Sequence, residues 1–316
     1  MIEMLQSPLM VRAFVVAILV GLAAPVVGTY LVQRRLTLLG DGIGHIALTG
    51  VAMGWLAANA ADAANKDAWA VPGAILFSVF GALLIEWMRG RGHASGDVAL
   101  ALLFYGGIAG GVFLMGIAGG TTSNLNSYLF GSISTVTRLD MILTIVLAVF
   151  VIGVGLGLKP ALFTLAHDEE FAKAIGLPTS LLSALIAVTA ALTVSVAMRV
   201  VGALLVSALM IVPVAITQLL ARSFKATMSG AMVIGVLVAI TGLTTTYYYP
   251  WSPGATIVLY AVGLYLLVAI LRPLIFIAMG RFGHQRDPHP DLHPDMTHKD
   301  HRCDPDIENC LERLKE

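Results

Sequence analysis

Long apolar runs, separated by short polar connections, follow one another along almost the whole chain. A membrane hydrocarbon core about 30 Å thick is crossed by a helix of roughly 20 apolar residues, and nine runs approach that length. Only Arg199 separates the seventh run from the sixth, so eight spans plus a half-helix is an alternative to nine spans. The runs cover Ala13–Val32, Leu38–Ala58, Val71–Met88, Val98–Ile117, Met141–Leu158, Leu181–Met198, Val200–Leu220, Met228–Thr244 and Ala255–Phe276.

The composition indicates the same class of protein. Hydrophobic residues make up 58% of the 316 residues and charged residues only 12%, whereas charged residues are about 25% of an average soluble domain. We therefore expect an all-α integral membrane protein, a polytopic bundle of about eight or nine transmembrane helices within residues 1–280. We expect membrane lipid to surround this helical bundle. The formal net charge of zero gives no reason to expect nucleic acid as a partner.

Basic residues are distributed unevenly between alternate connections, and this predicts the orientation. One set of connections carries nine Lys or Arg residues and the other set four, and cytoplasmic loops carry the excess. The N-terminus is then external, and the tail is cytoplasmic. The richer set comprises Arg34, Arg35, Arg89, Arg91, Lys159, Lys173, Arg222, Lys225 and Arg272, against Arg12, Lys66, Arg138 and Arg199.

Two ionisable residues interrupt the second apolar run. Asp41 and His45 are four positions apart, so a helix would place them on one face, with Thr49 next along the same stripe. Ionisable groups inside a membrane are costly and often functional, and a carboxylate with an imidazole can bind a divalent metal. The alternative is an Asp at the start of a helix and a His hydrogen-bonded to a neighbouring helix.

A polar stretch between the fifth and sixth runs predicts a short helix on a cytoplasmic connection. Asp168 suits the N-cap position, Gly176 suits the position after the last turn, and Pro178 prevents continuation. An exposed apolar edge on such a helix suits docking of another protein, whereas an interfacial helix on lipid headgroups is the alternative. The expected docking residues are Asp168, Glu169, Phe171, Ala174, Ile175 and Gly176.

The tail at residues 281–316 has a different composition. It interleaves His with Asp and Pro and lacks apolar periodicity, so we expect it to be a separate, disordered region. Tracts rich in His and Cys bind metals such as zinc, but no structural-zinc spacing is present. We expect weak metal binding at most, or an inert tail. The candidate ligands are His284, His289, His293, His298, His301 and Cys303.

Four stretches of this chain resemble the permease subunits of zinc/manganese-type metal ABC importers. In that family the Asp and His that correspond to Asp41 and His45 are associated with metal passage. The stretch at residues 167–178 resembles the coupling helix by which such permeases engage their ATPase. The chain departs from the family by having Gly44 and Thr49 where many members carry Ser and Pro. The stretches are residues 34–54, 125–133, 167–178 and 200–213.

The resemblance implies an ABC importer permease fold related to the cobalamin and siderophore type. It implies a homodimer in the plasma or inner membrane of a prokaryote, with an ABC ATPase subunit inside and an extracytoplasmic metal-binding protein outside. The sequence has no G-x-x-x-x-G-K-S/T phosphate loop. We therefore expect a channel-forming subunit that is not an enzyme and holds no permanent cofactor, with ATP hydrolysis in a separate subunit.

The expected function is ATP-driven import of a divalent metal ion. Asp and His together can bind Zn²⁺, Mn²⁺ or Fe²⁺, and the composition of the tail favours zinc. One alternative is a siderophore- or cobalamin-type permease, for which a metal-coordinating pair would be surplus. Another is an ion-coupled secondary transporter that uses Asp41 as its proton carrier, against which the predicted docking helix argues.

Overall fold

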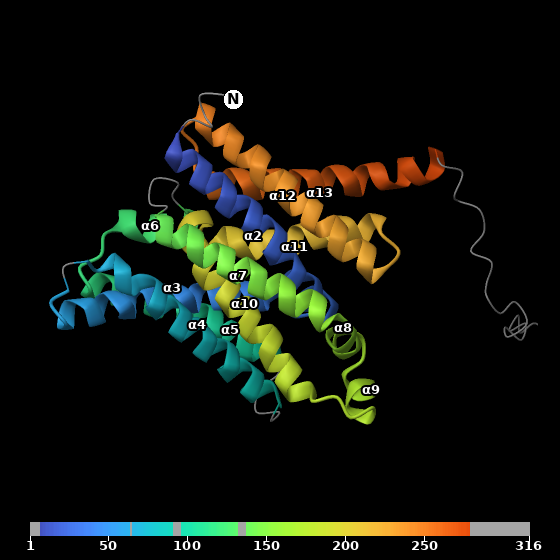
Figure 1. Cartoon of the computed structure of the whole chain (residues 1–316), viewed down its shortest axis with the longest axis horizontal. Helices are drawn as coiled ribbons and strands as arrows, with labels where there is room; N and C mark the ends of the chain where they lie inside the picture. Colours follow the sequence, from blue (N-terminus) through green and yellow to red (C-terminus); the bar gives the residue numbers. More distant parts are fainter. Residues whose placement is uncertain (1–6, 64, 91–95, 132–136, 279–316) are drawn as a thin grey trace, which may run out of the picture. The chain divides into compact units, whose positions relative to one another are not determined.

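The computed structural model describes residues 7–63, 65–90, 96–131 and 137–278. Contacts divide the chain into Met1–Arg272 and Pro273–Glu316. The tail from 281, with its candidate metal ligands, lies outside the described residues. The described residues form helices and no strand: α2 (Pro8–Gln33), α3 (Thr37–Ala60), α4 (Asp67–Gly90), α5 (Gly96–Ile117), α6 (Thr122–Phe130), α7 (Arg138–Gly157), α8 (Lys159–His167), α9 (Glu169–Ala174), α10 (Thr179–Val201), α11 (Ala203–Leu220), α12 (Phe224–Tyr248) and α13 (Pro253–Ala278) (Figure 1).

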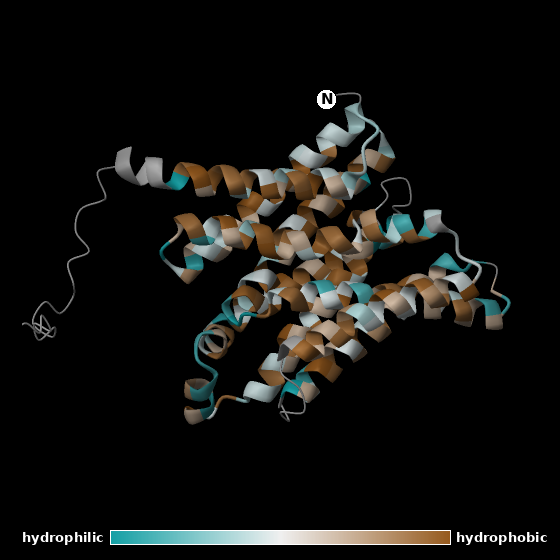
Figure 2. Ribbon diagram, turned by 180° about the vertical axis from the view of Figure 1, so that it is seen from behind, coloured by the Kyte–Doolittle hydropathy of each residue, from teal (hydrophilic) through white to brown (hydrophobic). Residues whose placement is uncertain are grey.

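Nine of the described helices are long and apolar enough to cross a membrane, which confirms the all-helical membrane class. Most of these helices begin before the apolar run that predicted them, because polar residues can cap a helix outside the run. For example, α12 begins at Phe224 rather than at Met228, and Oγ of Ser223 accepts a hydrogen bond from the N–H of Ala226 at 3.2 Å. Figure 2 shows apolar residues along these helices and polar residues gathered near their ends.

α10 and α11 are separate helices, and the break between them lies at Gly202 rather than at Arg199. Gly202 has a φ of 96°, a backbone conformation that residues with a side chain rarely adopt. A Cβ at this position would also lie 2.6 Å from backbone atoms at the end of α6. The structure therefore supports nine spans over eight spans and a half-helix, and the end of α6 covers the junction.

The apolar pattern gave no indication of α6 and α8. α6 begins with a capping box, in which the Thr121 hydroxyl accepts from the Asn124 N–H at 3.3 Å and the Asn124 side chain accepts from the Thr121 N–H at 3.1 Å. α8 follows α7 after a single residue and has Pro160 in its first turn, a position that favours proline. In Figure 1, α6 lies at the opposite end of the bundle from α8 and α9.

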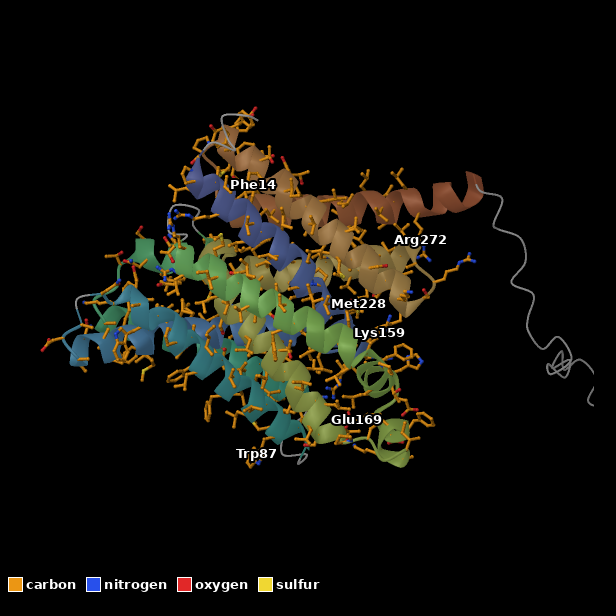
Figure 3. The ribbon with its side chains drawn as sticks, viewed as in Figure 1. Phe14, Trp87, Lys159, Glu169, Met228 and Arg272 are labelled. Carbon is orange, nitrogen blue, oxygen red and sulfur yellow. The ribbon has the colours of Figure 1, made fainter. Side chains whose placement is uncertain are left out.

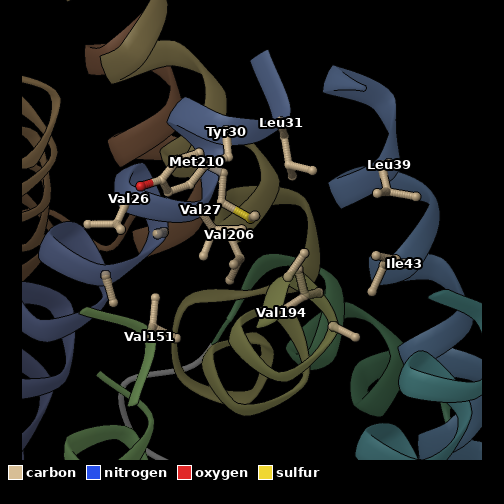
Figure 4. Packing of buried hydrophobic residues seen from close by; sticks show 14 of the residues in the cluster. Val26, Val27, Tyr30, Leu31, Leu39, Ile43, Val151, Val194, Val206 and Met210 are labelled. Atoms are coloured by element: carbon tan, nitrogen blue, oxygen red, sulfur yellow. The ribbon is translucent and has the colours of Figure 1, made fainter. Parts of the chain in front are cut away.

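α2 lies in the middle of the bundle, where it packs against α7, α10, α11 and α12. Tyr30 of α2 is buried, and its hydroxyl donates to the carbonyl oxygen of Gly155 in α7 at 2.5 Å. Such close packing and hydrogen bonding hold helices together in lipid. α3 packs against α4, α5, α10 and α11, so the helix that carries Asp41 and His45 is enclosed. Figure 4 shows this core, with Val26, Val27, Leu31, Leu39, Ile43, Val151, Val194, Val206 and Met210.

Candidate functional site

α3 places Asp41 and His45 on one face, as their spacing predicted. Nε2 of His45 lies 3.9 Å from Oδ1 of Asp41, and the side chains are 6% and 27% exposed, respectively. α3 begins at Thr37 and has no acidic residue in its first turn, so Asp41 is not the helix-start residue of the alternative explanation. The result is a carboxylate oxygen and an imidazole nitrogen, close together within a membrane-spanning helix.

Ser207 brings α11 into this site. Its Oγ lies 3.3 Å from Oδ1 of Asp41 and 3.0 Å from the carbonyl oxygen of Leu204. A serine hydroxyl has a single proton, so the Asp41 carboxylate competes with the Leu204 carbonyl for it. Gly40 of α3 faces Ser207 and Met210 of α11. Ser207 therefore provides a third oxygen atom beside the carboxylate.

α5 closes the site from another side. The ring of Phe104 meets the His45 ring edge to face, with 4.6 Å between centroids and 82° between planes. Thr49 donates to the carbonyl oxygen of Gly107 at 2.8 Å. A Cβ at Gly107 would lie 2.7 Å from the carbonyl carbon of His45, so this glycine permits the close approach of the two helices. Nδ1 of His45 is buried and finds no hydrogen-bond partner among the described residues. The alternative explanation required a hydrogen bond from His45 to a neighbouring helix, and Nδ1 makes none to the described residues.

One chain supplies only part of a metal coordination sphere. In the part of the chain that the structure describes, no group of three or more His, Cys, Asp or Glu side chains could hold a metal ion. Zinc usually takes about four ligands, and manganese favours octahedral coordination rich in oxygen. Asp41, His45 and Ser207 would therefore need water or a second chain to complete the sphere. A partial site suits a passing ion, which must bind and then leave.

α9 has the caps that the sequence predicted. Oδ1 of Asp168 accepts a hydrogen bond from the N–H of Phe171 at 2.8 Å, and Gly176 follows the last turn with a φ of 82°. One side of α9 is seated on the bundle, where Ala172 is completely buried. The other side carries three exposed apolar residues, which we call the docking surface: Phe171, Ala174 and Ile175.

Charged residues join α9 to the connection between α2 and α3. Nη2 of Arg34 lies 3.3 Å from Oε2 of Glu169, and Nζ of Lys173 lies 2.9 Å from Oε1 of the same carboxylate. The hydrogen bond from Lys173 is the main cause that lowers the pKa of Glu169, and the charges of Lys173 and Arg34 add to it against the effect of burial. Burial lowers the pKa of Arg34, while the charges of Glu86 and Glu169 act in the opposite direction. Figure 3 labels Glu169 on α9 and Trp87 on α4 at the same end of the bundle.

A second polar cluster lies at the opposite end of the helices. Oδ1 of the buried Asp140, in the first turn of α7, lies 3.6 Å from Nη1 of Arg199 near the end of α10. Asp67, Tyr128 and Arg199 line a small polar cavity. Burial raises the pKa of Tyr128 to about 12, and the charge of Asp67 acts in the same direction. The cluster joins α4, α6, α7 and α10 at the end that the basic residues predict to be external.

The structure brings Asp41 together with His45 and places α9 in a separate region. Reasoning from the sequence did not identify Ser207 or Arg34 as parts of either site. Both residues lie in stretches that resemble the permease family, which was the available signal. Neither has a sequence spacing that would predict its contact, because their partners lie 166 and 135 positions away, respectively.

Comparison with known proteins gives consistent matches. The ABC 3 transport family model matches residues 6–272. The manganese transport system membrane protein MntC of Halalkalibacterium halodurans is 29% identical over 271 residues, which cover 86% of this chain and 90% of the relative. A chain of PsaBC from Streptococcus pneumoniae, solved in complex with Fab, superposes with a TM-score of 0.74 at 29% identity, covering 84% of this chain and 93% of that chain.

A more distant structure supports the fold alone. It is described as an inward-facing metal-chelate type ABC transporter, and it superposes with a TM-score of 0.56 at 16% identity over 86% of each chain. The family match covers most of this chain and nearly all of its described helices. The chain therefore belongs to the ABC 3 transport family, which confirms the ABC permease class that its sequence predicted.

Proposed function

We propose that this permease carries manganese into the cell past Asp41 and His45 in an ATP-driven importer. The observation that carries the proposal is a carboxylate and an imidazole 3.9 Å apart on a helix suited to cross the membrane. The hydroxyl of Ser207 from a second helix lies beside the carboxylate. A pair of this kind is costly in a membrane, and a passing divalent cation would compensate the charge of Asp41.

Manganese is our proposed cargo for two reasons. The relative from Halalkalibacterium halodurans is named for manganese transport, and carboxylate and hydroxyl oxygens suit Mn²⁺. Zinc, which the composition of the tail favoured, stays a prediction, because the tail ligands lie outside the described residues. An Asp–His pair accepts either ion, so the identity of the cargo has to come from competition between the two ions during transport.

The incomplete coordination sphere supports a homodimer in which two Asp41–His45 pairs face one path. Two copies would supply two carboxylates and two imidazoles, which is enough for a four-coordinate ion and leaves room for Ser207 or water around a six-coordinate one. One Asp41–His45 pair alone supplies too few ligands to hold an ion tightly.

The exposed docking surface on α9 supports a separate ATPase subunit as the source of energy. This sequence contains no phosphate loop, and Phe171 and Ile175 are 56% and 53% exposed on the side of α9 that faces away from the bundle. An extracytoplasmic binding protein would deliver the metal at the other end. The proposed role of this chain is therefore to form the path and to couple it to ATP hydrolysis elsewhere.

The test is manganese uptake into proteoliposomes that contain the permease, its ATPase and its binding protein. Asp41→Asn and His45→Gln should each lower ATP-dependent uptake at least about tenfold, since even partners of a metal ligand contribute that much. Asp62→Asn makes the same chemical change as Asp41→Asn at an exposed position and should leave uptake unchanged.

Three outcomes would contradict parts of the proposal. Normal uptake in both site variants would remove Asp41 and His45 from the path. Uptake that needs an ion gradient and no ATP would favour the secondary transporter. Zinc uptake that excess manganese does not inhibit would identify zinc, rather than manganese, as the cargo.

A further inference from the structure

We propose that Arg34 is a positioning residue that links α9 to the start of α3, so that movement of α9 is transmitted to Asp41 and His45. The inference rests on the proposed function, in which α9 receives the ATPase and α3 holds the passing metal. It adds a physical connection between α9 and the Asp41–His45 site, which lie in separate regions of the structure. The geometry that points to this route is the ion pair between Arg34 and Glu169, 3.3 Å apart.

The connection between α2 and α3 is short and tightly bonded. The N–H of Arg34 donates to Tyr30 at 3.0 Å, and the N–H of Leu36 donates to Leu31 at 2.8 Å. Arg35 has a φ of 58°, a region that residues with a side chain seldom occupy. A connection held in this way has little freedom, so a displacement of Arg34 is passed to the first turn of α3. From there Asp41 is about 6 Å away along the helix axis.

At the other end of the link, Glu169 is the first residue of α9. It lies two positions before Phe171, the largest apolar side chain of the docking surface. Its second carboxylate oxygen is bound by Lys173 of the next turn at 2.9 Å, which fixes the carboxylate relative to α9. A partner that moves the docking surface therefore moves the carboxylate that holds Arg34.

The burial of Arg34 gives this ion pair more weight than an exposed pair would have. The Arg34 side chain is 5% exposed and that of Glu169 is 43% exposed. Exposed ion pairs contribute little, but a buried guanidinium that loses its partner is strongly unfavourable. Glu86, the other acid that acts on Arg34, already binds Arg89 at 3.3 Å. Arg34 is therefore expected to follow Glu169 rather than to separate from it.

The experiment compares transport with ATP hydrolysis in the complete reconstituted importer. Arg34→Gln should keep the ATPase bound in pull-down and keep hydrolysis near the wild-type rate. For Glu169→Gln, which lies on the expected docking helix itself, transport is compared at equal ATP hydrolysis, so that any loss of docking does not enter the ratio. The manganese imported per ATP hydrolysed should fall about fivefold or more, the lower end of the range for coupling between two sites. The double variant should be no worse than either single variant, because both remove the same contact. Arg34→Lys, which keeps the charge, should restore part of the ratio.

Arg35→Gln is the matched control, since it removes a charge from the adjacent, exposed position of the same connection and should keep the wild-type ratio. An unchanged ratio in Glu169→Gln would overturn the proposal. This variant is decisive if Arg34→Gln fails to fold, because Glu169 is partly exposed. Losses that add up in the double variant would also overturn it. Failure of the proposed function is seen separately, as a wild-type importer without ATP-dependent uptake or as normal uptake in Asp41→Asn.

Discussion

Replacing Phe171 with alanine should weaken binding of the ATPase subunit about thirtyfold and leave the permease folded. Phe171 is 56% exposed. An aromatic side chain can bury about 200 Å², so roughly 110 Å² of Phe171 is available to a partner. At about 25 cal/mol per Å², complete burial of that area contributes about 3 kcal/mol. Alanine keeps part of the contact, so we expect a loss of about 2 kcal/mol, a typical value for an interface hot spot.

The assay is a titration of labelled ATPase subunit into the permease in nanodiscs, with the Kd as its result. Phe171→Asp should bind more weakly than Phe171→Ala, because it would also place a charge in the interface. Phe14→Ala is the matched control, since Phe14 of α2 packs against a buried cluster that contains Met10 and Leu243, away from the end of the bundle where Figure 3 labels Glu169 of α9. That variant should lower the melting temperature of the permease and leave the Kd unchanged. A wild-type Kd with both Phe171 variants would refute the docking assignment and favour a helix that lies on lipid headgroups.

Gly107→Ala should lower both the melting temperature and manganese uptake, because its Cβ would lie 2.7 Å from the His45 carbonyl carbon; Gly106→Ala, whose Cβ meets nothing within 4 Å, should change neither. Because the pKa of Glu169 is lowered, its ion pairs stabilise α9 above the ordinary glutamate range and are lost only as pH falls through the lowered pKa. Hydrogen-exchange protection of α9 should therefore stay constant from about pH 8 to about pH 5 and fall below that. A chain that ends at Gly283 should insert and import manganese at saturating concentration, and insertion without import would contradict our interpretation of the tail.

The nine spans could be predicted because lipid allows few alternatives to a continuous apolar helix. The ends of the helices were less predictable, since caps such as Ser223 lie outside the apolar run. α6 and α8 were missed because each has only nine residues, and short helices depend on tertiary packing. The junction between α10 and α11 was placed at Arg199, the visible charge, whereas the backbone turns at Gly202, where only glycine suits the conformation.

The two sites were predictable where their geometry is local. Asp41 and His45 are four residues apart, and the caps of α9 lie within one short stretch, so helix geometry alone placed them correctly. The contacts of Ser207 with Asp41 and of Arg34 with Glu169 depend on which helices pack together. That information resides in the packing of the whole bundle and not in any sequence spacing.

Random mutagenesis of this chain would return Gly202 among the positions that abolish transport, although Gly202 is not a candidate ligand. A side chain there is disfavoured twice, by the φ of 96° and by the lack of room beside α6. Cells that express such alleles would contain less mature permease in the membrane, because α10 and α11 could not meet in their native arrangement. The abundance of the protein, measured beside uptake, therefore separates a folding lesion from a metal-binding lesion in any genetic screen of this transporter.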